Sequence, residues 1–369
     1  KARVPRKMLR RAKRIVVKIG SNLLAPGGDM DRRFIGALAR ECASLVRSGK
    51  EVLIVSSGAI AAGLKPLGLS RKPGDLPMLQ AAAAAGQGLL MHAYQVAFGR
   101  QELVAAQILI TRDGLEHRER YLNARNTALA LLKRKAVPVI NENDTVSVDE
   151  IRLGDNDRLS ALVASFVSAD LLVMLSDVPG LLDAEGQVVA RVEKVDASVR
   201  ALVGSHKSAE GTGGMATKLE AAEIGRKGGF HVVLASGRES DVLARVADGE
   251  EIGTWFLAGE ERPAARKQWL AFSQKSEGRI VVDDGAVRAL VERHKSLLPS
   301  GVVRSEGRFR AGAGVSIVTK RGREVARGIS NYSAADIEKI KGRKTSELAG
   351  IVGEAHFDEV VHRDNLTTV

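Results

Sequence analysis

The stretch Arg14-Ile-Val-Val-Lys-Ile-Gly20 predicts a buried β-strand that ends in a turn. Val52-Leu-Ile-Val-Ser-Ser-Gly58 repeats this pattern after a helical stretch at 33–48. Further apolar runs, at 104–109, 137–140, 171–175 and 232–235, alternate with helical patterns at 78–98, 118–134, 157–168 and 215–228. Continuous apolar strands alternating with helices are typical of a mainly parallel sheet covered on both faces. We therefore expect a three-layer αβα fold.

Polar and glycine-rich clusters follow the predicted strands where each strand ends. They are Gly20-Ser-Asn22, Ser56-Ser-Gly58, Asn141-Glu-Asn-Asp144 and Ser176-Asp177. In parallel sheets the ligand site lies outside the carboxyl ends of the strands. These clusters are therefore expected to lie around one active site.

A second glycine-rich segment, Gly211-Thr-Gly-Gly-Met-Ala-Thr-Lys218, leads into a helical pattern. Such a loop lets backbone N–H groups approach a phosphate, and the helix N-terminus and an ammonium add positive potential. The segment thus predicts a phosphate-binding loop. A plain surface turn is the alternative for this segment taken alone.

The chain has 369 residues, which suits two domains, and its net charge of +12 is unevenly distributed. Residues 1–14 carry +8, residues 15–262 carry −2 and residues 263–369 carry +6. The 1–14 segment is expected to be a solvated, disordered tail. One cysteine, Cys42, excludes an internal disulfide framework. No apolar run reaches the roughly 18 residues of a membrane span. A cytoplasmic protein without membrane association is expected.

Several enzyme classes lack their motifs here. The sequence has no Gly-x-x-x-x-Gly-Lys-[Ser/Thr] motif, no Gly-x-Gly-x-x-Gly after the first strand and no His-x-x-x-His pair. What remains is Lys18, the glycine turns, the 211–218 loop, and the acidic segments Asn141–Asp144 and Gly154–Asp157. Acidic groups beside lysines and phosphate-binding glycines favour phosphoryl transfer.

Six stretches in order resemble the amino-acid kinase family along nearly the whole chain. They are Val16-Val-Lys-Ile-Gly-Ser21, Val55–Gly63, Arg118–Arg125, Pro138–Asp144, Gly154–Asp157 with Leu159-Ser-Ala161, and Gly211–Lys218. The C-terminal part resembles a PUA domain, through Leu297–Val302, Gly307-Arg-Phe309 and Val325–Tyr332. The implied domains are a basic tail at 1–14, a kinase domain at 15–262, a linker helix at 263–275 and a β-rich PUA-like domain at 276–363.

The resemblance implies ATP-dependent phosphorylation of the L-glutamate γ-carboxylate to L-glutamyl 5-phosphate, the first step of proline biosynthesis. By matched position, Lys18 and Lys218 neutralise the transferring phosphoryl group, and Asp157 organises the two lysines. The implied glutamate-binding residues are Ser57, Gly58, Asn141, Asp144, Asp155 and Asn156. The nucleotide side comprises Lys18, Gly20, Ser176, Asp177, Thr212, Gly213, Gly214, Met215 and Lys218. Gly20 and Gly58 are expected to bring backbone N–H groups close to the phosphate.

ATP and Mg²⁺ are the implied cofactors, with no protein residue assigned as a metal ligand. The expected partners are L-glutamate, further copies of the chain in a dimer or tetramer, a glutamyl-phosphate reductase, and L-proline as feedback inhibitor. One alternative is another kinase of this fold, acting on aspartate, acetylglutamate, carbamate or a nucleotide. The other is an RNA-binding protein using the +6 C-terminal region, but that region lacks the interleaved aromatics used to stack bases. RNA is therefore not an expected partner.

Overall fold

The computed structural model describes residues 5–146, 156–205, 213–259, 276–352 and 357–368. The chain forms two compact units, one made of residues 1–115 and 119–262 and the other of residues 116–118 and 263–369. The sequence-predicted linker helix at 263–275 falls outside the described residues.

The first unit is built on an eight-stranded sheet with the order β3-β4-β2-β1-β5-β7-β8-β6. The strands are β1 (Arg14–Ile19), β2 (Glu51–Val55), β3 (Ala105–Ile110), β4 (Val137–Glu142), β5 (Leu171–Ser176), β6 (Arg191–Val192), β7 (His231–Ser236) and β8 (Thr254–Phe256). All pairs are parallel except β7 with β8. The predicted mainly parallel sheet is confirmed.

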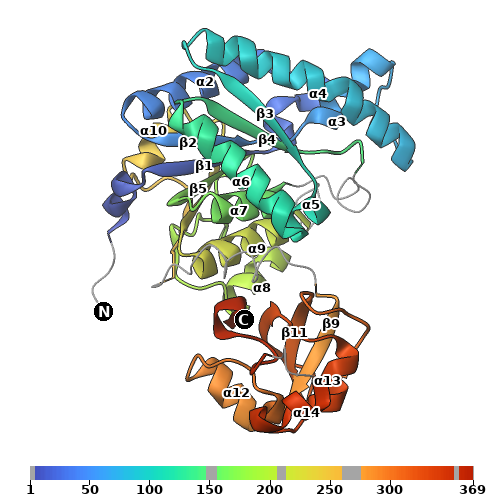
Figure 1. Ribbon diagram of the computed structural model, residues 1–369. Coiled ribbons are helices and arrows are strands. Elements are labelled where there is room, and N and C mark those ends of the chain that lie inside the picture. The colour runs from blue at the N-terminus through green and yellow to red at the C-terminus, as the bar shows by residue number, and fades with distance from the viewer. Residues whose placement is uncertain (1–4, 147–155, 206–212, 260–275, 353–356, 369) are drawn as a thin grey trace. The chain divides into compact units, whose positions relative to one another are not determined.

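Helices cover both faces of this sheet (Figure 1). One layer contains α2 (Arg32–Arg47), α3 (Ala59–Leu64), α4 (Leu76–Gly99) and α10 (Val242–Ala247). The other contains α6 (Arg118–Lys133), α7 (Asp157–Phe166), α8 (Ala197–Ser205) and α9 (Gly213–Gly228). The short helices α1 (Ser21–Leu24) and α5 (Arg112–Glu116) directly follow β1 and β3. No helix in the described ranges combines the length and the apolar character needed to cross a membrane.

Side-chain alternation along β1 determines where its lysine points. Ile15, Val17 and Ile19 belong to the core cluster that includes α2 and α4. Because successive side chains of a strand point to opposite faces, Val16 and Lys18 face the other layer. That layer contains α7 and α9, which pack against each other. One buried strand thus contributes to the apolar core on one face and to a polar centre on the other.

The basic N-terminal segment differs from its prediction. Residues 6–11 form a short 3-10 helix in which Leu9 is buried. The Arg6 guanidinium is also buried and donates to the carbonyl oxygens of Ile252 and Gly253. The expectation of a solvated, disordered end is therefore wrong for these residues. Apolar burial and satisfied carbonyl groups outweigh the high charge that suggested disorder.

The second unit is a five-stranded sheet with the order β10-β9-β11-β12-β13. Its strands are β9 (Gly278–Val282), β10 (Val302–Glu306), β11 (Gly314–Thr319), β12 (Glu324–Ile329) and β13 (Leu366–Thr368). Only the β9–β11 pair is parallel. The helices α12 (Asp284–Val291), α13 (Ala334–Ile340) and α14 (Ala349–Val352) accompany the sheet, and the unit has its own apolar core. This agrees with the small β-rich fold expected from the sequence.

Candidate active site

Two lysines from distant segments meet at one carboxylate. Lys18 Nζ on β1 lies 2.6 Å from Asp157 Oδ1. Lys218 Nζ on α9 lies 3.0 Å from Asp157 Oδ2. The Asp157 side chain is fully buried, and the lysine side chains are only 5% and 10% exposed. The two lysines that the sequence predicted to be catalytic therefore both contact the third predicted catalytic residue, Asp157.

The charges of this centre do not cancel. Two ammonium groups share one carboxylate, so these three side chains together carry a net charge of +1 in a water-poor environment. Asp157 begins α7, where the positive end of the helix dipole helps to stabilise its carboxylate. Thr217 Oγ1 donates to Asp157 Oδ2 at 3.0 Å and adds further support. A buried centre of this kind attracts a second anion more strongly than an exposed lysine pair would.

The first turn of α9 orients Lys218. The carbonyl oxygen of Gly214 accepts a hydrogen bond from Lys218 Nζ at 3.0 Å, and it shares the single Thr217 hydroxyl proton with Asp157 Oδ2. Met215 is half-buried in the same turn. α9 begins at Gly213, so backbone N–H groups at the helix start are available to an anion. The predicted nucleotide-site residue Thr212 falls outside the described residues.

Buried amide side chains hold the turn after β2. Asn156 Nδ2 donates to the Ser56 carbonyl oxygen at 2.6 Å and to Asn141 Oδ1 at 2.8 Å. Asn141 Nδ2 in turn donates to Gln87 Oε1 at 2.8 Å. The Ser56 hydroxyl lies 3.0 Å from the buried Tyr94 hydroxyl. The network joins β2, β4, α4 and the start of α7, and it fixes the backbone next to the lysine–aspartate centre.

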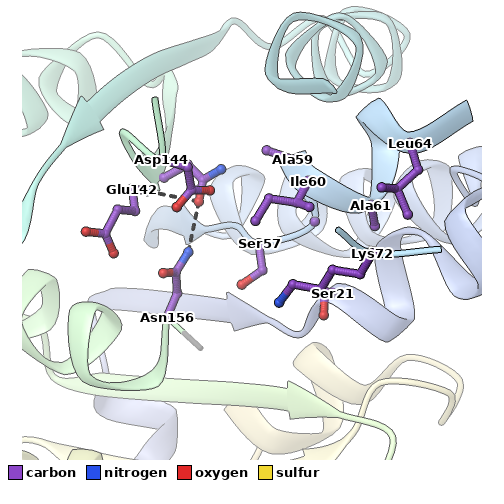
Figure 2. A pocket seen from close by; sticks show the side chains of 12 residues that line it. Ser21, Ser57, Ala59, Ile60, Ala61, Leu64, Lys72, Glu142, Asp144 and Asn156 are labelled. Carbon is purple, nitrogen blue, oxygen red and sulfur yellow. Dashed lines mark hydrogen bonds between the residues drawn. The ribbon is translucent and has the colours of Figure 1, made fainter. Parts of the chain in front are cut away.

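A cavity of about 120 Å³ adjoins this network (Figure 2). The structure brings together four of the predicted glutamate-binding residues, and their side chains line this cavity. They are Ser57, Asn141, Asp144 and Asn156. Gly58, the fifth, also borders it and has φ of +89°, a left-handed conformation that favours glycine. Asp155, the sixth, falls outside the described residues.

Ser57 stands out within the cavity lining. It is only 6% exposed, and its hydroxyl oxygen has no hydrogen-bond partner in the described part of the chain. A buried polar atom without a partner is unfavourable unless a ligand or water satisfies it. The unsatisfied Ser57 hydroxyl therefore indicates that this cavity binds a polar ligand.

Gly20 lies at the turn after β1. Its N–H group donates to the Leu175 carbonyl oxygen at 3.1 Å and extends the β1–β5 ladder. This N–H group is therefore already used within the protein. A backbone contact to phosphate from this turn would come from another N–H group, and the role of Gly20 in bringing such groups close stays a prediction.

Ser176 and Asp177 lie at the end of β5. The Ser176 hydroxyl donates to Asp177 Oδ1 at 3.0 Å, and Asn22 Nδ2 donates to Asp177 Oδ2 at 3.3 Å. Burial alone raises the pKa of the Asp177 carboxyl, but these hydrogen bonds and the positive charge of Lys218 together lower it below its usual value. Asp177 is thus ionised at neutral pH and within electrostatic reach of the lysine pair.

Sequence reasoning missed several residues of the site. Glu142 and Lys72 line the cavity, Thr217 binds Asp157, and Gln87 and Tyr94 support the amide network from α4. Glu142 and Thr217 lie inside the predicted motifs at 141–144 and 211–218, so the neighbouring motif residues could have indicated that these two also belong to the site. Gln87 and Tyr94 lie in an alanine-rich helix whose pattern indicates only packing.

The chain is similar to known proteins over both of its units. Residues 13–236 match the model of the amino acid kinase family, and residues 278–352 match that of the PUA domain. The glutamate 5-kinase of Moorella thermoacetica is 48% identical over 365 residues, covering 97% of each chain. That of Caldanaerobacter subterraneus is 46% identical over 363 residues, covering 96% of this chain and 98% of its own. That of Syntrophotalea carbinolica is 47% identical, covering 97% and 98%.

These matches confirm the resemblance inferred from the motifs. The family match covers the unit that contains Lys18, Asp157 and Lys218, and the curated relatives align over nearly their whole length. The chain therefore belongs to the amino acid kinase family and carries a PUA domain in its second unit.

Proposed function

We propose that this protein transfers the γ-phosphoryl group of ATP to the side-chain carboxylate of L-glutamate, forming L-glutamyl 5-phosphate and ADP. The observation that carries the proposal is the buried contact of Lys18 and Lys218 with the Asp157 carboxylate, next to a cavity lined by carboxylates and amides. Relatives nearly 50% identical over almost the whole chain carry the name glutamate 5-kinase.

The chemistry requires no catalytic base. A carboxylate is already ionised at neutral pH, so one of its oxygens attacks the γ-phosphorus directly while the bond to the bridging oxygen of ADP breaks. The barrier is electrostatic: a −1 nucleophile about 4 Å from a −2 phosphoryl group is repelled by roughly 8 kcal/mol at an effective dielectric constant near 20. Cations and N–H donors held in place beforehand must offset that repulsion.

The residues of the centre suit this task. Lys18 on β1 and Lys218 on α9 approach from different elements, and Asp157 fixes the position of both amines. The start of α9 offers backbone N–H groups for the nucleotide phosphates. Because both ammonium groups are held before substrates bind, little reorganisation is needed during transfer.

Magnesium fits the centre as a nucleotide-bound ion. The described residues contain no group of three or more His, Cys, Asp and Glu that could hold a metal. Mg²⁺ commonly keeps several waters and binds through substrate phosphates with one or two carboxylates. Asp177, ionised beside the lysine pair, is the carboxylate that we propose for this contact. The ion would supply additional screening of phosphate charge.

The cavity suits an amino-acid substrate. Glu142 and Asp144 provide carboxylates for an α-ammonium group, and Ser57 provides an unsatisfied hydroxyl. The product is an acyl phosphate that water hydrolyses readily. A reductase that consumes it, inhibition by L-proline, and assembly into a dimer or tetramer belong to the same proposal.

Hydroxylamine trapping tests this proposal. Purified protein is incubated with Mg-ATP, hydroxylamine and L-glutamate, and the hydroxamate formed from the acyl phosphate is measured. Parallel reactions contain L-aspartate, N-acetyl-L-glutamate or no acceptor, and UMP is tested by ADP release. We expect hydroxamate with L-glutamate well above the other acceptors. No hydroxamate above the no-acceptor background would refute the proposal.

A further inference from the structure

The cavity beside the catalytic centre contains a basic side chain as well as acidic ones. Among the described residues that line it, Lys72 is the only lysine or arginine. It lies between the 3-10 helix Lys65–Leu67 and α4, in an exposed segment. Figure 2 shows its side chain extending into the cavity.

The charges of the cavity and of the proposed substrate do not match without this lysine. Glu142 and Asp144 contribute two negative charges to the lining. L-glutamate has one ammonium group and two carboxylates. The ammonium group is satisfied by the acidic residues, and the γ-carboxylate must face the phosphoryl group near Lys18. The α-carboxylate then lies beside two acidic residues, and Lys72 is the basic side chain of the described lining that can bind it.

We propose that Lys72 binds the α-carboxylate of the amino-acid substrate and thereby selects acceptors that carry one. The inference rests on the proposed function, since it assigns a residue to the acceptor pocket of that reaction. Lys72 enters from the segment that precedes α4, whereas Glu142 ends β4 and Asp144 follows that strand. The cation and the anions therefore come from different elements and can bind the two α-substituents of one substrate.

An exposed lysine suits this role better than a buried one. Its flexible stem lets the ammonium group follow the substrate in and out of the pocket. Hydrogen bonds to charged groups contribute more than neutral ones, so losing this contact should weaken binding roughly tenfold or more. Because Lys72 is proposed to contact the non-reacting carboxylate, its loss should raise KM and leave kcat nearly unchanged.

The test compares Lys72→Met with Arg71→Met. The control removes the same charge from the neighbouring exposed position, which does not line the cavity. We expect KM for L-glutamate to rise roughly tenfold or more in Lys72→Met, with kcat within about twofold of the unaltered protein. Arg71→Met should keep both constants, and Lys72→Arg should restore most of the affinity.

A substrate analogue identifies the group that Lys72 contacts. 4-Aminobutyrate retains the amine and the reacting carboxylate of L-glutamate but lacks the α-carboxylate. Its inhibition constant against L-glutamate should be the same in the unaltered protein and in Lys72→Met. A parallel weakening of both ligands, a fall in kcat at constant KM, or an unchanged KM for L-glutamate would each overturn the assignment. If the unaltered protein forms hydroxamate, such a result refutes the Lys72 assignment alone; if it forms none, both proposals fail.

Discussion

Lys18 and Lys218 lie 200 positions apart in the chain, and yet their Nζ atoms are 2.6 and 3.0 Å from the two oxygens of one carboxylate, that of Asp157. One lysine comes from a central strand and the other from a helix that covers it. Each amine is thus fixed by a different element, and the shared carboxylate sets their separation. We interpret Asp157 as a positioning residue, since it acts through the two lysines.

Replacing Lys18 with methionine should abolish most of the activity while the fold survives. The side chain keeps its volume, and Asp157 keeps its contact with Lys218. By analogy with the loss of one preorganised donor, kcat should fall by on the order of 10²–10³. The hydroxamate assay measures this, and circular dichroism checks the fold. Lys13→Met, a neighbouring substitution outside the site, serves as the control. A kcat within a few-fold of the unaltered protein would show that the role of Lys18 is misassigned.

Replacing Asp157 with asparagine should affect stability as well as rate. The substitution leaves two buried ammonium groups without their counter-ion, and breaking a buried ion pair typically costs about 3–5 kcal/mol. Urea unfolding measures the change in the free energy of unfolding. Asp248→Asn is a suitable control, because Asp248 is 67% exposed and its nearest ion-pair distance, to Arg10, is 3.8 Å. A loss below about 1 kcal/mol for Asp157→Asn would contradict the buried ion-pair arrangement.

Much of the first unit could be predicted because local patterns determine it. The apolar runs around Val16 and Leu53 form central strands, and the polar residues after β1, β2, β4 and β5 lie at their carboxyl ends. The edge strand β6 and its neighbour β8 could not be predicted because they contain only two and three residues. A run of that length has no periodicity to detect.

Parts of the site could not be read from sequence because they depend on contacts between distant segments. Gln87 reaches Asn141 across 54 positions, and nothing in its alanine-rich surroundings indicates a polar partner. Lys72 lies in Ser70-Arg-Lys-Pro-Gly74, a composition typical of a surface turn. For the N-terminal segment, the high positive charge predicted disorder, whereas Leu9 of this segment is buried in the structure.

The lowered pKa of Asp177 predicts a specific pH dependence of stability. A carboxyl whose folded pKa lies below its unfolded value contributes stability above the unfolded value and loses it as pH falls through the folded pKa. For Asp177 the loss should therefore begin below the ordinary pKa of 3.8. Asp177→Asn should reduce the slope of unfolding free energy against pH in this acidic range. Equal slopes for the two proteins would show that Asp177 does not titrate differently on folding.

Two glycines allow α3 to pack closely against α4. Gly63 and Gly86 lie where the two helices approach so closely that a Cβ atom on Gly86 would be 1.9 Å from the Ala59 carbonyl oxygen. Gly86→Ala must therefore displace backbone, and we expect a loss of about 1–3 kcal/mol in the free energy of unfolding. Because α3 follows the Ser57–Gly58 turn, KM for L-glutamate should rise as well.

Gly88→Ala is a matched control in the same helix. A Cβ atom there meets no atom within 4 Å, so the better helix propensity of alanine should raise the unfolding free energy by about 0.5–1 kcal/mol. Thermal or urea unfolding of both variants measures the change in unfolding free energy, and the hydroxamate assay measures KM. Opposite signs for the two substitutions would support close helix packing as the support of the acceptor pocket. Stabilisation of both, with unchanged KM, would show that α3 shifts without consequence for the site.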